Sequence, residues 1–207
     1  MIKALVSEFN KSQIQYAITG AIAASYYGRP RSTTDVDFIV KVNPKNLFGF
    51  IRLLQEAGLD SDEKRIKAQV ASGYDVVTVQ DRSSPYDADF ILRPTGPLPR
   101  KSGTLRGVRA FYQTPEDLIL AKLRIIKATV SEERTTNHKA DIYSILANTR
   151  VNRRKIIQGA KRETTLEIFT NITRREIVKE DKTIKKYERG SLPRLKPIAR
   201  EKTDRFG

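Results

Sequence analysis

The sequence contains no cysteine and a single histidine, His138. The lack of cysteine excludes disulfide bonds and thiolate metal sites, and one histidine alone supplies neither a catalytic triad nor a histidine-based zinc site. No run approaches the about 18 consecutive apolar residues of a membrane-spanning helix. The first residues lack the apolar segment and the small-residue cleavage site of a signal peptide. We therefore expect a cytoplasmic protein that does not contact a membrane.

Acidic residues are too few to balance the basic ones, since 24 Asp and Glu stand against 39 Lys and Arg, for a net charge of +15. Residues 150–207 hold 18 of the basic and 8 of the acidic residues, a net charge of +10. Such a segment attracts polyanions, nucleic acid first and an anionic membrane second. Because the segment lacks a strong membrane-anchoring apolar face, we favour RNA as its partner. The alternative is a solvated basic tail.

Hydrophobic periodicity divides the chain into an α/β part and a following helical part. Strands are expected at residues 15–19, 35–42, 74–80, 86–92 and 107–112. Helices are expected at residues 2–11, 21–27 and 44–57, from Thr114-Pro115 onward, around residues 142–146, and from near residue 151. Thr114 can cap its helix and Pro115 suits the first turn, and the apolar stripe of that helix is Ile119, Leu123, Ile126 and Val130. Residues 190–207, with two prolines and many charges, are expected to be extended or disordered.

This order of elements predicts an α+β fold. We expect an N-terminal mixed β-sheet core flanked by helices, followed by a C-terminal helical part. The expected division is a core at residues 1–112, a helical subdomain at residues 113–162, and a basic C-terminal helix or tail at residues 163–207, partly extended.

Two carboxylates lie close together on the expected strand at residues 35–42. Asp35 and Asp37 point to the same face, roughly 7 Å apart at ~3.3 Å rise per residue. Like charges held together are costly unless a cation lies between them, and Mg²⁺ prefers carboxylate and phosphate oxygens. Asp89 offers a third carboxylate, with Asp87 as the alternative, and three converging carboxylates would hold two metal ions for phosphoryl chemistry. An isolated acid-x-acid pair is more often a solvated surface.

A glycine precedes these carboxylates by fifteen residues. The expected strand at residues 15–19 stops at Gly20, and a turn and short helix follow. A glycine at this point allows backbone amides to approach phosphate oxygens closely.

Gly20-Ala21, then thirteen residues, then Asp35-Val36-Asp37 resembles the signature of the polymerase-beta-like nucleotidyltransferase superfamily. The longer strings at residues 18–23 and 28–37 are similar to the small bacterial and archaeal members that include AbiEii-type toxins. Residues 115–123 and Asp141-Ile142 are similar to the helical motifs of that group. The resemblance covers roughly residues 14–147. Ala21 departs from the Gly or Ser usual in the family, and His138 stands where relatives often have an acid.

The resemblance implies a nucleotidyltransferase core that moves a nucleotidyl group from an NTP to an acceptor, with two Mg²⁺ or Mn²⁺ ions. Asp35, Asp37 and Asp89 would be the catalytic and metal-binding residues, and Asp89 would help to deprotonate the attacking hydroxyl. The nucleotide-binding residues would be Gly20, Ala21, Arg31, Ser32, Lys122 and Asp141.

Three of these side chains also have simpler interpretations. Arg31 is either a phosphate clamp, for which its planar fork is suited, or a surface charge near a turn. Lys122 either reaches into the cleft or extends from the edge of the core to water. Asp141 either pairs with Lys122 and orients it, or is an acid on the helix surface.

Three functions are compatible with the sequence. The first is transfer to RNA, with tRNA as the first candidate, or to a protein, and it includes a role as the toxin of a pair with a cognate antitoxin. The second is transfer to a small molecule such as an antibiotic, although an acidic cleft would suit a cationic aminoglycoside better than a chain of net charge +15. The third is a non-catalytic nucleotide- or nucleic-acid-binding module, which the departure at Ala21 favours and the three acids disfavour.

Overall fold

A seven-stranded mixed sheet forms the centre of the molecule, seen in a computed structural model that describes residues 1–43 and 45–174. The strand order is β3-β4-β5-β2-β1-β7-β6. The strands are β1 (Tyr16–Ile18), β2 (Asp35–Val40), β3 (Leu59–Asp60), β4 (Val76–Asp81), β5 (Asp87–Leu92), β6 (Arg100–Leu105) and β7 (Val108–Gln113). Strand β2 lies inside the sheet, antiparallel to β1 and parallel to β5.

Alternation along β2 separates an apolar face from an acidic one. Val36, Phe38 and Val40 are buried, whereas Asp35 is exposed and Asp37 half-buried. This period-2 alternation confirms the assignment of faces made from the sequence. Ile39, on the face of Asp35 and Asp37, is buried as well, because a helix packs on that face too.

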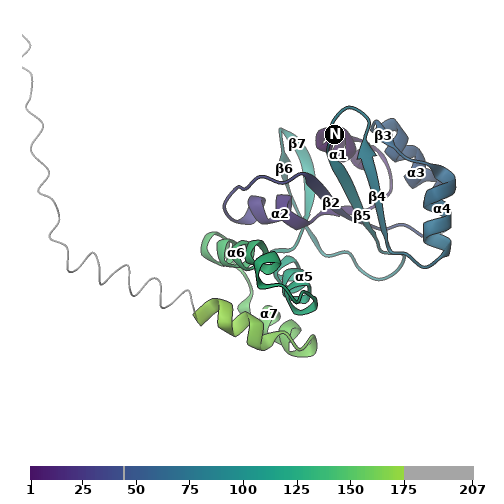
Figure 1. The fold of residues 1–207 in the computed structure, drawn as a ribbon. Coiled ribbons are helices and arrows are strands. Elements are labelled where there is room, and N and C mark those ends of the chain that lie inside the picture. The colour runs from purple at the N-terminus through teal and green to yellow at the C-terminus, as the bar shows by residue number, and fades with distance from the viewer. Residues whose placement is uncertain (44, 175–207) are drawn as a thin grey trace, which may run out of the picture.

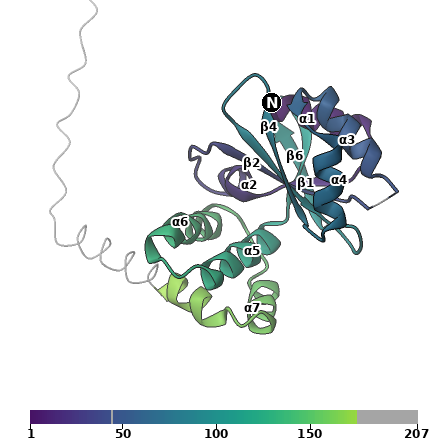
Figure 2. The same cartoon turned by 45° about the vertical axis from the view of Figure 1, so that its right-hand side comes forward.

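Aromatic packing joins the apolar face of the sheet to two helices, α1 (Ile2–Lys11) and α3 (Leu47–Glu56). The ring of Phe9 on α1 lies 5.5 Å from Phe38, and the ring of Phe50 on α3 lies 5.3 Å from Phe90. Aromatic pairs at such distances add stabilisation beyond the area that they bury. Helix α4 (Glu63–Ala71) lies beside α3, as Figures 1 and 2 show.

Four helices gather on the other side of the sheet: α2 (Gly20–Tyr27), α5 (Pro115–Ala128), α6 (Glu132–Asn148) and α7 (Arg153–Arg162). Helix α2 packs against both α5 and α6, and α7 packs against α5 (Figure 2). Residues 166–174 are also helical. Thr114 caps α5 by accepting a hydrogen bond from the Asp117 backbone N–H, and Pro115 lies in its first turn, as the sequence predicts.

The α+β fold class, with a mixed sheet flanked by helices and a helical part after it, is confirmed. Helix α4 and strands β3 and β6 were not predicted. The stripe on α5 is buried at Ile119, Leu123 and Ile126, but Val130 follows the end of that helix and is fully exposed, so its inclusion was wrong.

Parts of the sequence-based predictions stay untested. Residue 44, the expected start of α3, and residues 175–207, which include the expected extended segment 190–207, lie outside the described residues. The division at residues 112/113 and 162/163 also stays a prediction. Within the part of the chain that the structure describes, no helix has the length and apolar character needed to cross a membrane.

Candidate active site

The predicted carboxylates lie on two neighbouring parallel strands. Asp35 stands opposite Asp87 and Asp37 opposite Asp89 in the register of β2 with β5. Neighbouring strands are ~4.8 Å apart, so each of these pairs is close across the sheet. The register therefore brings Asp37 and Asp89 together, and it places Asp87 beside Asp35 instead.

Asp37 is the most constrained of these acids. Burial raises the pKa of its carboxyl group, and the nearby charges of Asp89 and Asp35 raise it further. Lys122 and a hydrogen bond from the backbone N–H of Ala21 act in the opposite direction. A positive charge placed between these carboxylates would relieve the repulsion, since an opposite charge within a few ångström favours the ionised form.

Gly20 is required by the close approach of the β1–α2 turn to Asp37. Its φ of 63° lies in the left-handed region that favours glycine. A Cβ at this position would overlap the Asp37 carboxylate. The turn therefore presents bare backbone at the site, directly against the Asp37 carboxylate.

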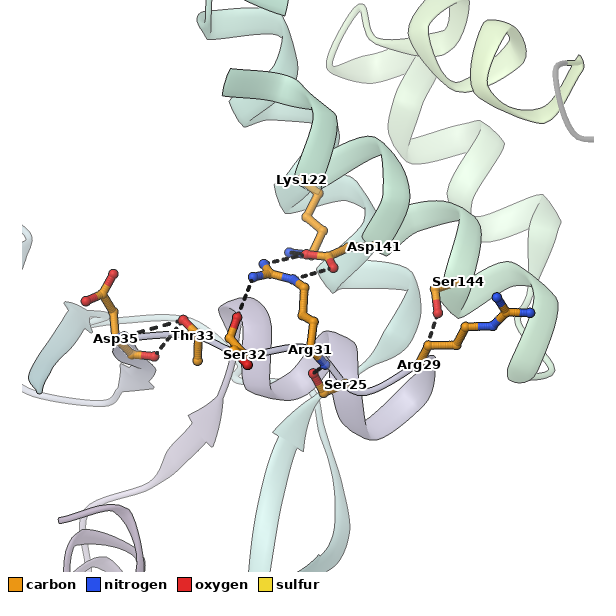
Figure 3. Close-up of polar contacts among 9 residues, drawn as sticks. All are labelled: Ser25, Arg29, Arg31, Ser32, Thr33, Asp35, Lys122, Asp141 and Ser144. Atoms are coloured by element: carbon orange, nitrogen blue, oxygen red, sulfur yellow. Dashed lines mark hydrogen bonds and ion pairs between the residues drawn. The ribbon is translucent and has the colours of Figure 1, made fainter. Parts of the chain in front are cut away.

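A carboxylate bridge joins the segment before β2 to α5 and α6. The Nε and Nη2 atoms of Arg31 donate to the two carboxylate oxygens of Asp141 at 2.8 and 3.0 Å. The ammonium group of Lys122 donates to Oδ2 of Asp141 at 2.7 Å. Figure 3 shows the two cations meeting on Asp141. The predicted pairing of Asp141 with Lys122 is thus present, and the fork of Arg31 is occupied by the same carboxylate.

Burial distinguishes the members of this bridge. Side-chain exposure is 3% for Lys122, 6% for Asp141 and 31% for Arg31. Burial by itself would raise the pKa of Asp141, but hydrogen bonds from Arg31 and Lys122 outweigh it and hold the pKa below its ordinary value.

The pKa of His138 is lowered, first by burial and then by the charge of Lys122, which favours the neutral imidazole.

The remaining predicted residues lie at the edge of this group. Ser32 is exposed, and its carbonyl oxygen accepts a hydrogen bond from Nη1 of Arg31 at 3.3 Å. Asp35 begins its strand, next to Thr33, and its side chain points away from the bridge in Figure 3.

The three carboxylates do not form a closed metal site in this conformation. Within residues 1–43 and 45–174, no three His, Cys, Asp or Glu side chains are placed so that they could hold a metal ion. Asp35 is exposed at the strand end, and one oxygen of Asp89 accepts a hydrogen bond from the Thr78 hydroxyl at 2.6 Å. Thr78 was missed in the sequence because only the register of β4 with β5 brings it opposite Asp89.

A cavity of about 820 Å³ lies on the far side of the bridge. It is bounded by residues 29–31, the outer face of α6, and residues 168–172. It shares Arg31 and Asp141 with the predicted site, but none of the acids of β2 and β5 lines it. This cavity and the predicted carboxylate site are therefore adjacent but not the same place.

Comparison with known proteins identifies the fold. No family profile matches the sequence, and no curated protein matches it significantly. Among solved structures, an antigenic nucleotidyltransferase-like protein from Paracoccidioides brasiliensis is similar, with a TM-score of 0.54 at 15% identity over 86% of this chain and 88% of that one. The antibiotic-resistance factor ANT(2'')-Ia is similar with a TM-score of 0.55 at 10% identity, over 88% of this chain and 95% of that one.

These likenesses establish a nucleotidyltransferase-like fold, and at such identities they establish the fold alone. The expected fold is therefore confirmed, whereas nucleotidyl transfer by this chain stays a prediction. They do not distinguish the AbiEii-like group from other proteins of this fold.

Proposed function

We propose that this protein is a metal-dependent nucleotidyltransferase that moves a nucleotidyl group from an NTP to an RNA acceptor, plausibly a tRNA. The observation that carries the proposal is the pairing of Asp37 with Asp89 across β2 and β5, directly beside the Gly20 turn. Carboxylates and a backbone turn that can face phosphate oxygens are the two parts that such a reaction needs together.

The residues at this point suit divalent cations. The mutual repulsion that raises the pKa of Asp37 is what a bound cation would remove. Asp37 and Asp89, joined by Asp35 after rotation of its exposed side chain, would hold the ions, two Mg²⁺ or Mn²⁺. Bound there, the ions would neutralise phosphate charge and stabilise the attacking and leaving oxygens.

The remaining residues would bind and orient the nucleotide. The turn at Gly20 and Ala21 would offer backbone N–H groups to the phosphates. Lys122 and Arg31, held by Asp141, would place positive charge beside the carboxylates. The acceptor hydroxyl would attack the α-phosphorus, pyrophosphate would leave, and Asp89 would accept the hydroxyl proton.

RNA is the proposed acceptor because of charge. The net charge of +10 on residues 150–207 favours a polyanion over a cationic small molecule. Two finer alternatives rest on the resemblance to AbiEii-type proteins alone. One is transfer to a protein acceptor, and the other is a toxin role with an antitoxin partner.

A second candidate function is a non-catalytic nucleotide- or RNA-binding module. Two observations favour it: Ala21 lacks a hydroxyl for phosphate, and both cations near the acids are already paired with Asp141. Salt-sensitive RNA binding without any transfer would be its signature.

The deciding experiment measures transfer of label from each of the four α-³²P NTPs to total RNA and total protein, with Mg²⁺ and with EDTA. The wild type is compared with Asp35→Asn/Asp37→Asn and with Asp75→Asn, a matched control at an exposed acid outside the site. We expect metal-dependent labelling of RNA that the double variant loses and the control keeps. Labelling that survives in the double variant would refute the proposed mechanism, and no labelling with RNA binding retained would favour the module.

A further inference from the structure

The excess of basic over acidic residues in residues 1–174 comes from two stretches of the chain. Residues 1–174 hold 28 Lys and Arg and 18 Asp and Glu. Residues 90–115 contain five of the basic residues and residues 142–162 contain six, and neither stretch contains an acid. The rest of residues 1–174 is balanced, with 17 basic and 18 acidic residues. The second stretch falls within the basic C-terminal region, whereas the first has no role in the proposed site.

The first stretch forms the β6–β7 hairpin and the loop before it. Its basic residues are Arg93, Arg100, Lys101, Arg106 and Arg109. Strand β6 is the edge of the sheet, at the end opposite β3 (Figure 1). Within residues 1–43 and 45–174, none of these five cations forms an ion pair with a carboxylate. Arg93 directly follows β5, and its backbone N–H donates to the Val40 carbonyl oxygen inside the sheet. The hairpin itself therefore presents four positive charges that the described protein does not neutralise.

The tip of the hairpin has an arginine at a position where the backbone conformation favours asparagine or glycine. Arg106 and Gly107 connect Leu105 to Val108, which pair with each other, so the loop has two residues. Their φ values are 46° and 81°, and two-residue hairpin loops with positive φ strongly prefer Asn-Gly. An arginine in the left-handed region is uncommon. Its presence at the tip favours a role for the charge.

Two arginines of the hairpin are held in place by an aromatic ring. The guanidinium carbons of Arg100 and Arg109 lie 4.1 and 5.1 Å from the centroid of Phe111. Arg100 also donates to the carbonyl oxygen of Tyr16 at 3.0 Å. Planar guanidinium groups fixed in this way suit phosphate recognition and can stack on bases.

An RNA fits this surface better than a membrane. None of the exposed large hydrophobic side chains of the described structure belongs to residues 90–115. Membrane-binding surfaces combine basic residues with apolar side chains that enter the lipid. A basic surface without exposed apolar side chains is typical of a site that binds the phosphodiester backbone of a nucleic acid.

We propose that the β6–β7 hairpin is an RNA-binding surface, and that it holds the acceptor RNA whose end reaches the carboxylates. Strand β6 is three strands from β2, roughly 14 Å across the sheet at ~4.8 Å per strand. Arg100 pairs with Gln113 at the level of Asp37, whereas Arg106 lies six residues further along the chain, roughly 20 Å away along the strands at ~3.3 Å per residue. An RNA bound along the hairpin would therefore reach the carboxylates past Arg100, over several nucleotides. The acceptor role rests on the proposed function, whereas RNA binding by the hairpin does not.

The test measures binding of a fluorescently labelled single-stranded RNA to the full-length protein in EDTA without NTP, over a range of KCl concentrations. The hairpin variant is Lys101→Gln/Arg106→Asn/Arg109→Gln, which changes three exposed cations. The matched control is Arg52→Gln/Lys64→Gln/Lys67→Gln, which removes the same charge from α3 and α4. Each phosphate contact contributes about 0.7 to the slope of log K against log salt for single strands.

We expect the slope to fall by about 2 in the hairpin variant and to stay unchanged in the control. The single variant Arg106→Asn should lower the slope by about 0.7 while its melting temperature stays equal or rises, which a purely structural role for Arg106 would not produce. Equal slopes for hairpin variant and control would overturn the proposal. Binding to phosphatidylserine vesicles is measured with the same variants. A hairpin variant that loses vesicle binding but keeps RNA binding would also overturn the proposal.

The outcomes for the hairpin and for the reaction can be separated. Asp35→Asn/Asp37→Asn should bind RNA with the wild-type slope. If that slope falls in the hairpin variant while the wild type transfers no nucleotide, the RNA surface stands and the acceptor role is lost. If the wild type labels RNA and the hairpin variant keeps the wild-type slope, the hairpin proposal fails and the proposed function stands.

Discussion

Replacing Asp141 by asparagine should destabilise the protein strongly, because it leaves the ammonium group of Lys122 buried without a counter-charge. The two side chains are 6% and 3% exposed and their charged atoms lie 2.7 Å apart. Removing one partner of a buried ion pair costs about 3–5 kcal/mol. Total stabilities of domains are about 5–15 kcal/mol, so Asp141→Asn should remove a large share of the free energy of unfolding.

The geometry also predicts an order among variants. In Lys122→Met, Asp141 keeps both hydrogen bonds from Arg31, so the cost should be only that of a lost charged hydrogen bond, about 1.5–3 kcal/mol. In the double variant Asp141→Leu/Lys122→Met, Arg31 can turn to solvent, since its side chain is already 31% exposed. The double variant should therefore be more stable than Asp141→Asn.

Urea unfolding followed by circular dichroism measures these differences, provided that the slope m is unchanged. Glu56→Gln is the control, because the Arg52–Glu56 pair has a similar distance of 3.1 Å but side chains that are 62% and 53% exposed. Exposed pairs contribute at most about 1 kcal/mol. If Asp141→Asn costs no more than Glu56→Gln, the bridge does not stabilise the fold and the reasoning is refuted.

Three further predictions follow from single positions. Gly20→Ala should abolish nucleotidyl transfer and lower the melting temperature, because its Cβ would overlap the Asp37 carboxylate; wild-type transfer by this variant would contradict the proposed turn. The pKa of Asp141 is depressed on folding, so its contribution to stability is complete above the ordinary carboxyl pKa of about 4 and is lost as the pH falls through the lower folded value. Unfolding free energies from pH 7 to pH 2 should decline less in Asp141→Asn than in the wild type. Gly49→Ala, in the interior of α3 with nothing near its Cβ, should raise the free energy of unfolding by about 0.5–1 kcal/mol, and a loss on thermal or urea unfolding would contradict that helix.

The elements that the sequence predicted are those with a local signal. The acids of β2 were placed correctly because buried residues alternate with them along the strand. The start of α5 was predicted because Thr114 and Pro115 fix the chain geometry within one turn, independently of the rest of the fold.

The missed elements lack such a signal. Strand β6 reads Arg-Lys-Ser-Gly-Thr-Leu and has no fully buried residue, since it lies at the edge of the sheet. Helix α4 buries only Ile66, so it has no apolar stripe. Its cap Asp62, which accepts from the Arg65 backbone N–H, was the one local sign that could have revealed it.

The contacts of the candidate site also differ in how far they could be predicted from the sequence. The pairing of Asp141 with Lys122 was an open alternative, because both lie on helices nineteen residues apart. The two hydrogen bonds of Arg31 to Asp141 cross 110 residues, and no periodicity or cap reports a contact at that separation. Arg31 was therefore interpreted either as a phosphate clamp or as a surface charge near a turn, and neither interpretation included its pairing with Asp141.

Helix α2 packs against α5 and α6, which come roughly a hundred residues later in the chain. During synthesis, a chain that has emerged only as far as β7 holds Asp35, Asp37 and Asp89 but neither Lys122 nor Asp141. Such a nascent chain can already hold Tyr27 against β7, through its hydrogen bond to the Gln113 carbonyl oxygen, but the side of α2 that packs on α5 and α6 is still uncovered. Folding during synthesis proceeds from the N-terminus, so the proposed nucleotide site should be complete only after α6 has been made and has packed on α2.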